Sequence, residues 1–158
     1  MQTFTDTQGR VWTLHITVDT IKRVRALTGT DLLAVAGGDL LERLSTDPIL
    51  LADVIYACMQ PEADAKQVSD VDFGRALAGD VIGAATTALL QDIVDFFPAP
   101  KRALLAKALG KLGEVQTAAL AAASARLEAV DAAAVAREVL DGTSSGASPA
   151  SPASIQAP

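Results

Sequence analysis

The chain is poor in cysteine, histidine and aromatic residues, and each scarcity excludes a kind of bond, metal site or core. One cysteine among 158 residues cannot form a disulfide within the chain, and one histidine beside it cannot complete a His/Cys metal cluster. An aromatic fraction of 4% means that the core must be built mainly from Leu, Val, Ile and Ala. No apolar run approaches the roughly 18 residues of a membrane span, and the polar N-terminus does not resemble a signal peptide. We therefore expect a soluble, intracellular protein without membrane contact.

The arrangements that usually carry catalysis are also missing. His15 is expected on the solvent-exposed face of a strand and Cys58 on the buried face of a helix, so the two cannot form a nucleophile–base pair. Asp92 and Asp95 lie three residues apart on a predicted helix and could hold a hard cation, but two carboxylates are a weak signal. Gly37-Gly38 lacks the longer glycine pattern of a phosphate-binding loop. The sequence predicts a protein that is not an enzyme and has no metal or cofactor.

The net charge of −6 is unevenly distributed. Residues 47–96 carry two bases and nine acids, which argues against a nucleic-acid surface and leaves a solubilising acidic face as the simplest reading. The one tight basic cluster is Lys22, Arg23 and Arg25 on a short helix. Such a cluster either contacts phosphates or an acidic partner, or is an ordinary solvated face.

The N-terminal half is predicted to be a β-hairpin followed by short helices. Residues 2–18 form the hairpin around a turn at 6–9, with a core face at Trp12, Leu14, Ile16 and Val18. A helix capped by Asp19 runs to about residue 27, and an apolar piece broken by Gly37-Gly38 follows. A further helix starts at 46–48 and ends near residue 59, and residues 60–68 are predicted to form a polar loop.

The stretch from Ser69 to Leu112 has the densest apolar content. Ser69 and Asp72 resemble a capping box, and a helix follows from residue 81. The sequence at 97–100, Phe-Pro-Ala-Pro, ends that helix and opens the next, so Phe96, Phe97, Pro98 and Pro100 are predicted to form a corner. The last helix is predicted to run over 100–140, with a bend near its glycines, before a disordered Gly/Ser/Pro/Ala tail at 141–158.

Together these elements predict a mainly α (α+β) single domain over 1–140, a hairpin packed on five or six helices. The predicted core consists of Trp12, Leu14, Ile16, Leu50, Val54, Ile55, Phe73, Leu77, Ile82, Leu89, Ile93, Phe96, Leu104 and Leu105. The alanine-rich part of the last helix buries little area, so it is the best candidate for a surface completed by another chain. The candidate binding face is Leu104, Leu105, Ala108, Leu112, Val115 and Ala119.

The order of these features resembles the tail assembly chaperones of long-tailed bacteriophages and prophages. The resemblance covers about residues 4–112 and rests on the segments 11–14 (VWTL), 18–24 (VDTIKRV), 45–48 (STDP), 72–77 (DFGRAL) and 95–98 (DFFP) followed by Lys101-Arg102. Each segment is a cap, a corner or a core stripe that other helical domains also use.

The resemblance implies a non-enzymatic protein of the host bacterial cytoplasm, absent from the mature virion. Its partner would be the apolar, helical tape-measure protein, with the tail tube protein and further copies of itself as additional partners. The alternatives are a structural tail component retained in the virion and, less favoured at a pI near 4.6, a small DNA-binding regulator.

Overall fold

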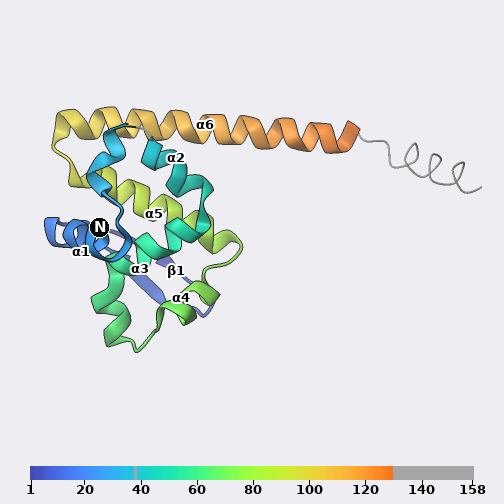
Figure 1. Cartoon of the computed structure of the whole chain (residues 1–158). Helices are drawn as coiled ribbons and strands as arrows, with labels where there is room; N and C mark the ends of the chain where they lie inside the picture. Colours follow the sequence, from blue (N-terminus) through green and yellow to red (C-terminus); the bar gives the residue numbers. More distant parts are fainter. Residues whose placement is uncertain (38, 130–158) are drawn as a thin grey trace, which may run out of the picture. The chain divides into compact units, whose positions relative to one another are not determined.

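The computed structural model describes residues 1–37 and 39–129, and it confirms a mainly α fold with an N-terminal hairpin (Figure 1). The chain divides into two compact units, residues 1–114 and 115–158, where the sequence predicted one domain over 1–140. In the second unit the structure describes 115–129, the later part of the last helix. The predicted end of that helix near residue 140 and the predicted tail at 141–158 lie outside the described residues.

The hairpin joins β1 (Gln2–Thr5) and β2 (Val11–Leu14) in an antiparallel pair, with Phe4 opposite Trp12. Its turn is built on Asp6, whose Oδ1 accepts hydrogen bonds from the backbone N–H groups of Gln8 and Arg10, both at 2.9 Å. Gly9 has a φ of 77°, a left-handed conformation that favours glycine. The predicted turn is therefore confirmed.

The predicted strand to Val18 is too long. Pairing ends where Leu14 meets Gln2, and the N–H of Ile16 donates to the Asp92 carboxylate at 2.5 Å instead of to a strand. Helix α1 (Val18–Thr28) then begins with an exposed Val18, so this residue leaves the predicted core face. Its N-cap is Thr17 rather than the predicted Asp19, which lies in the first turn.

The middle of the chain contains the 3₁₀ helix η1 (Leu32–Gly37), α2 (Asp39–Thr46) and α3 (Pro48–Ala65). The predicted start of α3 is confirmed, because Asp47 Oδ1 accepts from the N–H groups of Ile49 and Leu50 at 3.0 Å. The predicted end near residue 59 is wrong, since α3 continues through Pro61 to Ala65. The predicted loop at 60–68 is accordingly reduced to its last few residues.

Three further helices follow, α4 (Asp70–Ala76), α5 (Asp80–Phe96) and α6 (Ala99–Ala129). Ser69 is the N-cap of α4, as predicted, and its Oγ accepts from the N–H of Asp72 at 3.1 Å. Gly79, with a φ of 59°, precedes α5 and adopts backbone geometry that a side chain would strain. The predicted corner lies between α5 and α6.

The core of the first unit forms where the hairpin packs on α5 and α3, with α1 on the same α3 (Figure 1). At its centre the rings of Trp12 and Phe73 meet edge to face, with centroids 5.4 Å apart. Ten predicted core residues are buried, namely Trp12, Leu14, Ile16, Val54, Ile55, Phe73, Leu77, Leu89, Ile93 and Leu105. Leu50, Ile82 and Phe96 are partly buried, and Leu104 is exposed.

Candidate functional site

Helix α6 has two distinct apolar stripes, which the sequence-based candidate face combined. Leu105, Leu109 and Leu112, at spacings of four and three, lie against the core of the first unit. Leu105 is only 3% exposed, so it belongs to the core and is removed from the candidate face. Leu112 is partly buried in the same stripe.

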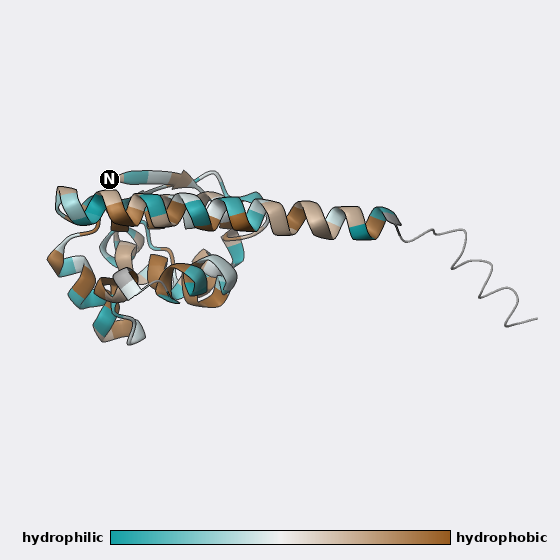
Figure 2. Cartoon of the chain, turned by 90° about the horizontal axis from the view of Figure 1, so that it is seen from above, coloured by the Kyte–Doolittle hydropathy of each residue, from teal (hydrophilic) through white to brown (hydrophobic). Residues whose placement is uncertain are grey.

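The remaining members of the candidate face lie about a quarter turn away on the helix. They are Leu104, Ala108, Val115 and Ala119, spaced by four, seven and four residues, and all are exposed. Leu104 was therefore wrongly placed in the core, because the 100° rotation between successive helical residues separates it from Leu105. Sequence reasoning missed Leu120 and Leu127, which are also exposed, at 70% and 74%. Figure 2 shows apolar and polar residues alternating along α6.

The corner between α5 and α6 is held by Phe97 more than by Phe96. Phe97 is buried and Phe96 partly buried, and their rings meet nearly edge to face at 5.3 Å. Lys101 Nζ lies 4.0 Å from the centroid of the Phe97 ring, and Arg102 Nε donates to the Phe97 carbonyl at 3.1 Å. Pro98 and Pro100 are exposed at the start of α6. The corner is a packed and capped joint.

Two cations of the basic cluster are engaged inside the chain. Arg23 Nη1 pairs with Asp19 at 2.9 Å, and Arg25 pairs with Asp31 at 2.7 Å. Within residues 1–37 and 39–129, Lys22 makes no ion pair. In that part of the chain the cluster thus offers one free cation instead of three, which weakens the case for a phosphate-binding surface.

Arg23 has a second role, which sequence reasoning missed. Its Nε donates to the carbonyl of Ala57 at 2.8 Å, and its Nη2 donates to the carbonyl of Cys58 at 3.0 Å. Pro61 has no N–H to give the carbonyl four residues before it, which is that of Ala57. The guanidinium supplies the missing donor, and this explains why α3 tolerates an internal proline.

The paired carboxylates Asp92 and Asp95 do not form a cation site. Asp92 is buried and accepts from the N–H of Ile16, while its Oδ1 lies 2.5 Å from the amino group of Met1. Asp95 accepts from the side-chain amides of Gln2 and Gln91, at 3.4 and 3.2 Å. Both carboxylates therefore link the N-terminal region to α5. No group of three or more His, Cys, Asp or Glu in the described part of the chain could hold a metal ion.

Cys58 is buried and His15 exposed, as predicted, although His15 lies beyond the strand in which it was expected. Cys58 is buried, and burial raises the pKa of its thiol to about 12, with the Arg23 charge opposing this rise and the Asp92 charge adding to it. His15 is exposed after the end of β2. A thiol with so high a pKa is not a nucleophile at neutral pH.

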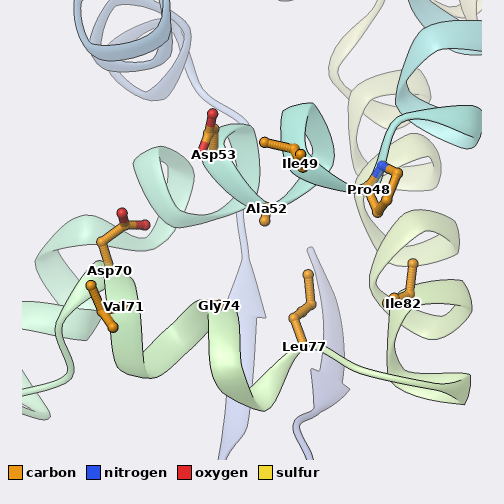
Figure 3. Close-up of a pocket in the computed structure, with 9 residues that line it drawn as sticks. All are labelled: Pro48, Ile49, Ala52, Asp53, Asp70, Val71, Gly74, Leu77 and Ile82. Atoms are coloured by element: carbon orange, nitrogen blue, oxygen red, sulfur yellow. The ribbon is translucent and has the colours of Figure 1, made fainter.

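A groove between α3 and α4 is a feature that the sequence did not indicate. It has a volume of about 390 Å³ and is lined by Pro48, Ile49, Ala52, Asp53, Asp70, Val71, Gly74, Leu77 and Ile82 (Figure 3). Ile49 and Val71 are 73% and 59% exposed. Both follow a helix start, where capping patterns rather than apolar spacing dominate the sequence, so no periodic signal marks them.

Among the described residues, no single helix is long and apolar enough to cross a membrane. Helices α4 and α5 reach that length and apolar content only together, and they are bent by 113° relative to each other. Comparisons with protein-family models, with curated proteins and with solved structures find no match to this chain.

Proposed function

We propose that this chain is a non-enzymatic tail assembly chaperone of a long-tailed bacteriophage or prophage. It binds apolar helices of the tape-measure protein and keeps them soluble while the tail tube assembles around them. The observation that carries the proposal is that α6 exposes several large apolar side chains, Leu104 in the first unit and Val115, Leu120 and Leu127 in the second. At 100° per residue, Leu120 and Leu127 lie close together around the helix, whereas Val115 lies on a different side. When a partner helix covers exposed leucines, the free energy of the complex falls by about 25 cal/mol per Å² of apolar surface buried.

The charge distribution supports the same role. A chaperone that exposes apolar surface needs net charge elsewhere to remain soluble before it meets its client. The acid-rich segment 47–96 supplies it, and most of its acids, including Asp53, Asp64, Asp70 and Asp72, are exposed. The chaperone would act in the cytoplasm of the bacterial host and leave before the virion is complete. The tail tube protein and a second copy of the chain are further candidate partners.

The test is co-expression with the long helical protein encoded beside this chain. Wild type should keep that client soluble and co-purify with it, whereas the double variant Leu104→Ser/Val115→Ser should lose it. Both side chains are exposed, so the double variant should change the free energy of unfolding by no more than about 1 kcal/mol. Leu112 is unsuitable for this test because it packs on the core.

Val18→Ser is the matched control, since Val18 is an exposed valine on α1. It should retain the client. A client that precipitates beside wild type, or one that the double variant holds equally well, would contradict the proposal. Detection of the chain in purified virions would favour the alternative, a structural tail component.

A further inference from the structure

The groove between α3 and α4 continues into a second one across a shared pair of carboxylates. The second groove, of about 340 Å³, is lined by Leu27, Thr28, Asp53, Tyr56, Ala57, Gln60 and Asp70. Asp53 on α3 and Asp70 on α4 line both grooves. Exposed Ile49 and Val71 line the first groove, and exposed Leu27 lines the second. Each groove therefore combines the acidic pair with exposed apolar side chains.

The acidic pair is not neutralised by the chain itself. Within the described residues, neither Asp53 nor Asp70 makes an ion pair, and no Lys or Arg lines either groove. Both carboxylates are exposed in the most acidic part of the sequence. A cation placed between them would be attracted by both charges, and apolar groups beside it would cover exposed valine, leucine and isoleucine.

Gly74 lines the first groove without a side chain. It lies inside helix α4, where glycine costs about 1 kcal/mol relative to alanine, and a Cβ at this position would meet no atom of the chain. Packing within the chain therefore does not require glycine here. Figure 3 labels Gly74 on α4, among the other lining residues. Because glycine has no side chain, the backbone of a bound segment would meet no obstacle at this position.

We propose that this double groove binds an amphipathic helix of a partner protein that carries apolar side chains around one Lys or Arg. The apolar side chains cover Ile49 and Val71 on one side and Leu27 on the other, and the cation lies between Asp53 and Asp70. The two grooves share no lining residue with α6, and the proposal does not depend on the function proposed above.

The test uses two synthetic peptides and the full chain. Each is an alanine-based helix of roughly 18 residues with leucines three and four residues apart; one has Lys between the leucines and the other has Glu. Fluorescence anisotropy should show tighter binding of the Lys peptide by roughly tenfold, with affinity falling as salt is added. Absence of binding by the Lys peptide, or equal affinity for the two peptides, would overturn the proposal.

Variants locate the contact. The double variant Asp53→Asn/Asp70→Asn should lower the affinity for the Lys peptide by roughly two- to tenfold. It should also bind the Lys and Glu peptides with equal affinity. Glu42→Gln, at an exposed acid of α2 outside the grooves, should leave both affinities unchanged. Equal loss in the Asn variant and in Glu42→Gln would show a nonspecific charge effect and would overturn the proposal.

A groove-filling variant tests the shape independently of charge. Gly74→Leu should weaken binding of both peptides, because the new side chain would occupy the groove. A Cβ at this position meets no other atom of the chain, so the substitution should not disturb the fold. Gly83→Leu is the matched control, since Gly83 is also helical, exposed and open at its Cβ but lies outside the groove. Unchanged binding by Gly74→Leu would refute the proposal. The Leu104→Ser/Val115→Ser variant should still bind the Lys peptide, which separates this test from that of the chaperone function.

Discussion

The indole N–H of Trp12 donates a hydrogen bond of 2.8 Å to the Oδ2 of Asp6, and both residues are buried. Arg10 Nε lies 2.6 Å from the same oxygen, and the backbone of the turn occupies the other oxygen of the carboxylate. One carboxylate thus ties the hairpin turn to the largest side chain of the core. The hairpin and the core are therefore expected to unfold together.

Asp6→Asn should lower the free energy of unfolding by about 2–4 kcal/mol, since it leaves the buried Trp12 N–H and the partly buried Arg10 guanidinium without a charged acceptor. Urea denaturation followed by Trp12 fluorescence measures this loss. Asp19→Asn, which removes an exposed Asp–Arg pair, is the control and should cost no more than about 1 kcal/mol. Equal losses in the two variants would show that the Asp6 network contributes little.

The stability contributed by Asp6 should depend on pH. Burial raises the pKa of this carboxyl, but the hydrogen bonds from Trp12, Arg10 and Gln8 outweigh it and hold the pKa below its ordinary value of 3.8. As the pH falls, Asp6 therefore becomes protonated in the unfolded chain before it does so in the folded chain. The stability that Asp6 contributes is complete above pH 3.8 and is lost as the pH falls through the lower pKa of the folded chain. The difference in unfolding free energy between wild type and Asp6→Asn should shrink in acid. A difference that stays constant down to the acid transition would contradict this account.

The hydrogen bonds from Arg23 to the Ala57 and Cys58 carbonyls should be coupled to Pro61. Arg23→Met should cost about 1–3 kcal/mol in the wild-type chain, because it leaves two carbonyls of α3 without a side-chain donor. In a Pro61→Ala background the cost should be smaller, since alanine restores the N–H for Ala57. A double-mutant cycle of unfolding free energies measures the coupling.

Arg25→Met is the control for that cycle. Arg25 lies two residues further along α1 and pairs with the partly exposed Asp31, which is not part of α3. The cost of Arg25→Met should therefore be the same in the wild-type chain and in the Pro61→Ala background. Additive costs for Arg23→Met and Pro61→Ala would show that the guanidinium does not replace the missing donor.

Phe97→Ala should destabilise the chain by about 3–5 kcal/mol, because the ring is buried at the α5–α6 corner and carries the Lys101 contact. Phe96→Ala should cost about half as much, since its ring is only partly buried. Thermal or urea unfolding of the two variants gives the comparison. A larger loss for Phe96 would reverse the assignment of the main anchor.

Cys58 should be unreactive in the folded chain. Burial raises its pKa to about 12, so thiolate is scarce at neutral pH, and the sulfur is also shielded from reagents. A chromogenic disulfide reagent should label it only after denaturant is added. Rapid labelling of the native chain would show that α3 opens around this residue.

Much of the local structure could be predicted from the sequence. The alternation around Trp12 and Leu14 identified a strand with a buried face, and both residues are buried. The caps at Asp47 and Ser69 placed the starts of α3 and α4 correctly. These signals succeed because strand alternation and helix caps involve groups only a few residues apart, whose geometry the local sequence sets.

The candidate site was predicted less well. Composition and alanine content identified α6 as the helix with uncovered apolar residues, and Leu104 and Val115 are exposed. The same reasoning could not separate them from Leu105, because a helix with apolar residues on several sides has no single periodic stripe. Only the packing of Leu105 and Leu112 on the core shows which side is covered.

Interactions between residues close in the sequence were enough to predict the hairpin, most helix starts, the proline corner and ten residues of the buried core. Long-range packing was needed to show that α3 passes through Pro61, that Asp92 accepts from Ile16, and that Asp53 and Asp70 face the same grooves. Each of these features depends on a partner distant in the chain. The hydrogen-bond donor to a carbonyl or carboxylate cannot be predicted from a local sequence pattern, because donor and acceptor meet only when the local elements pack together.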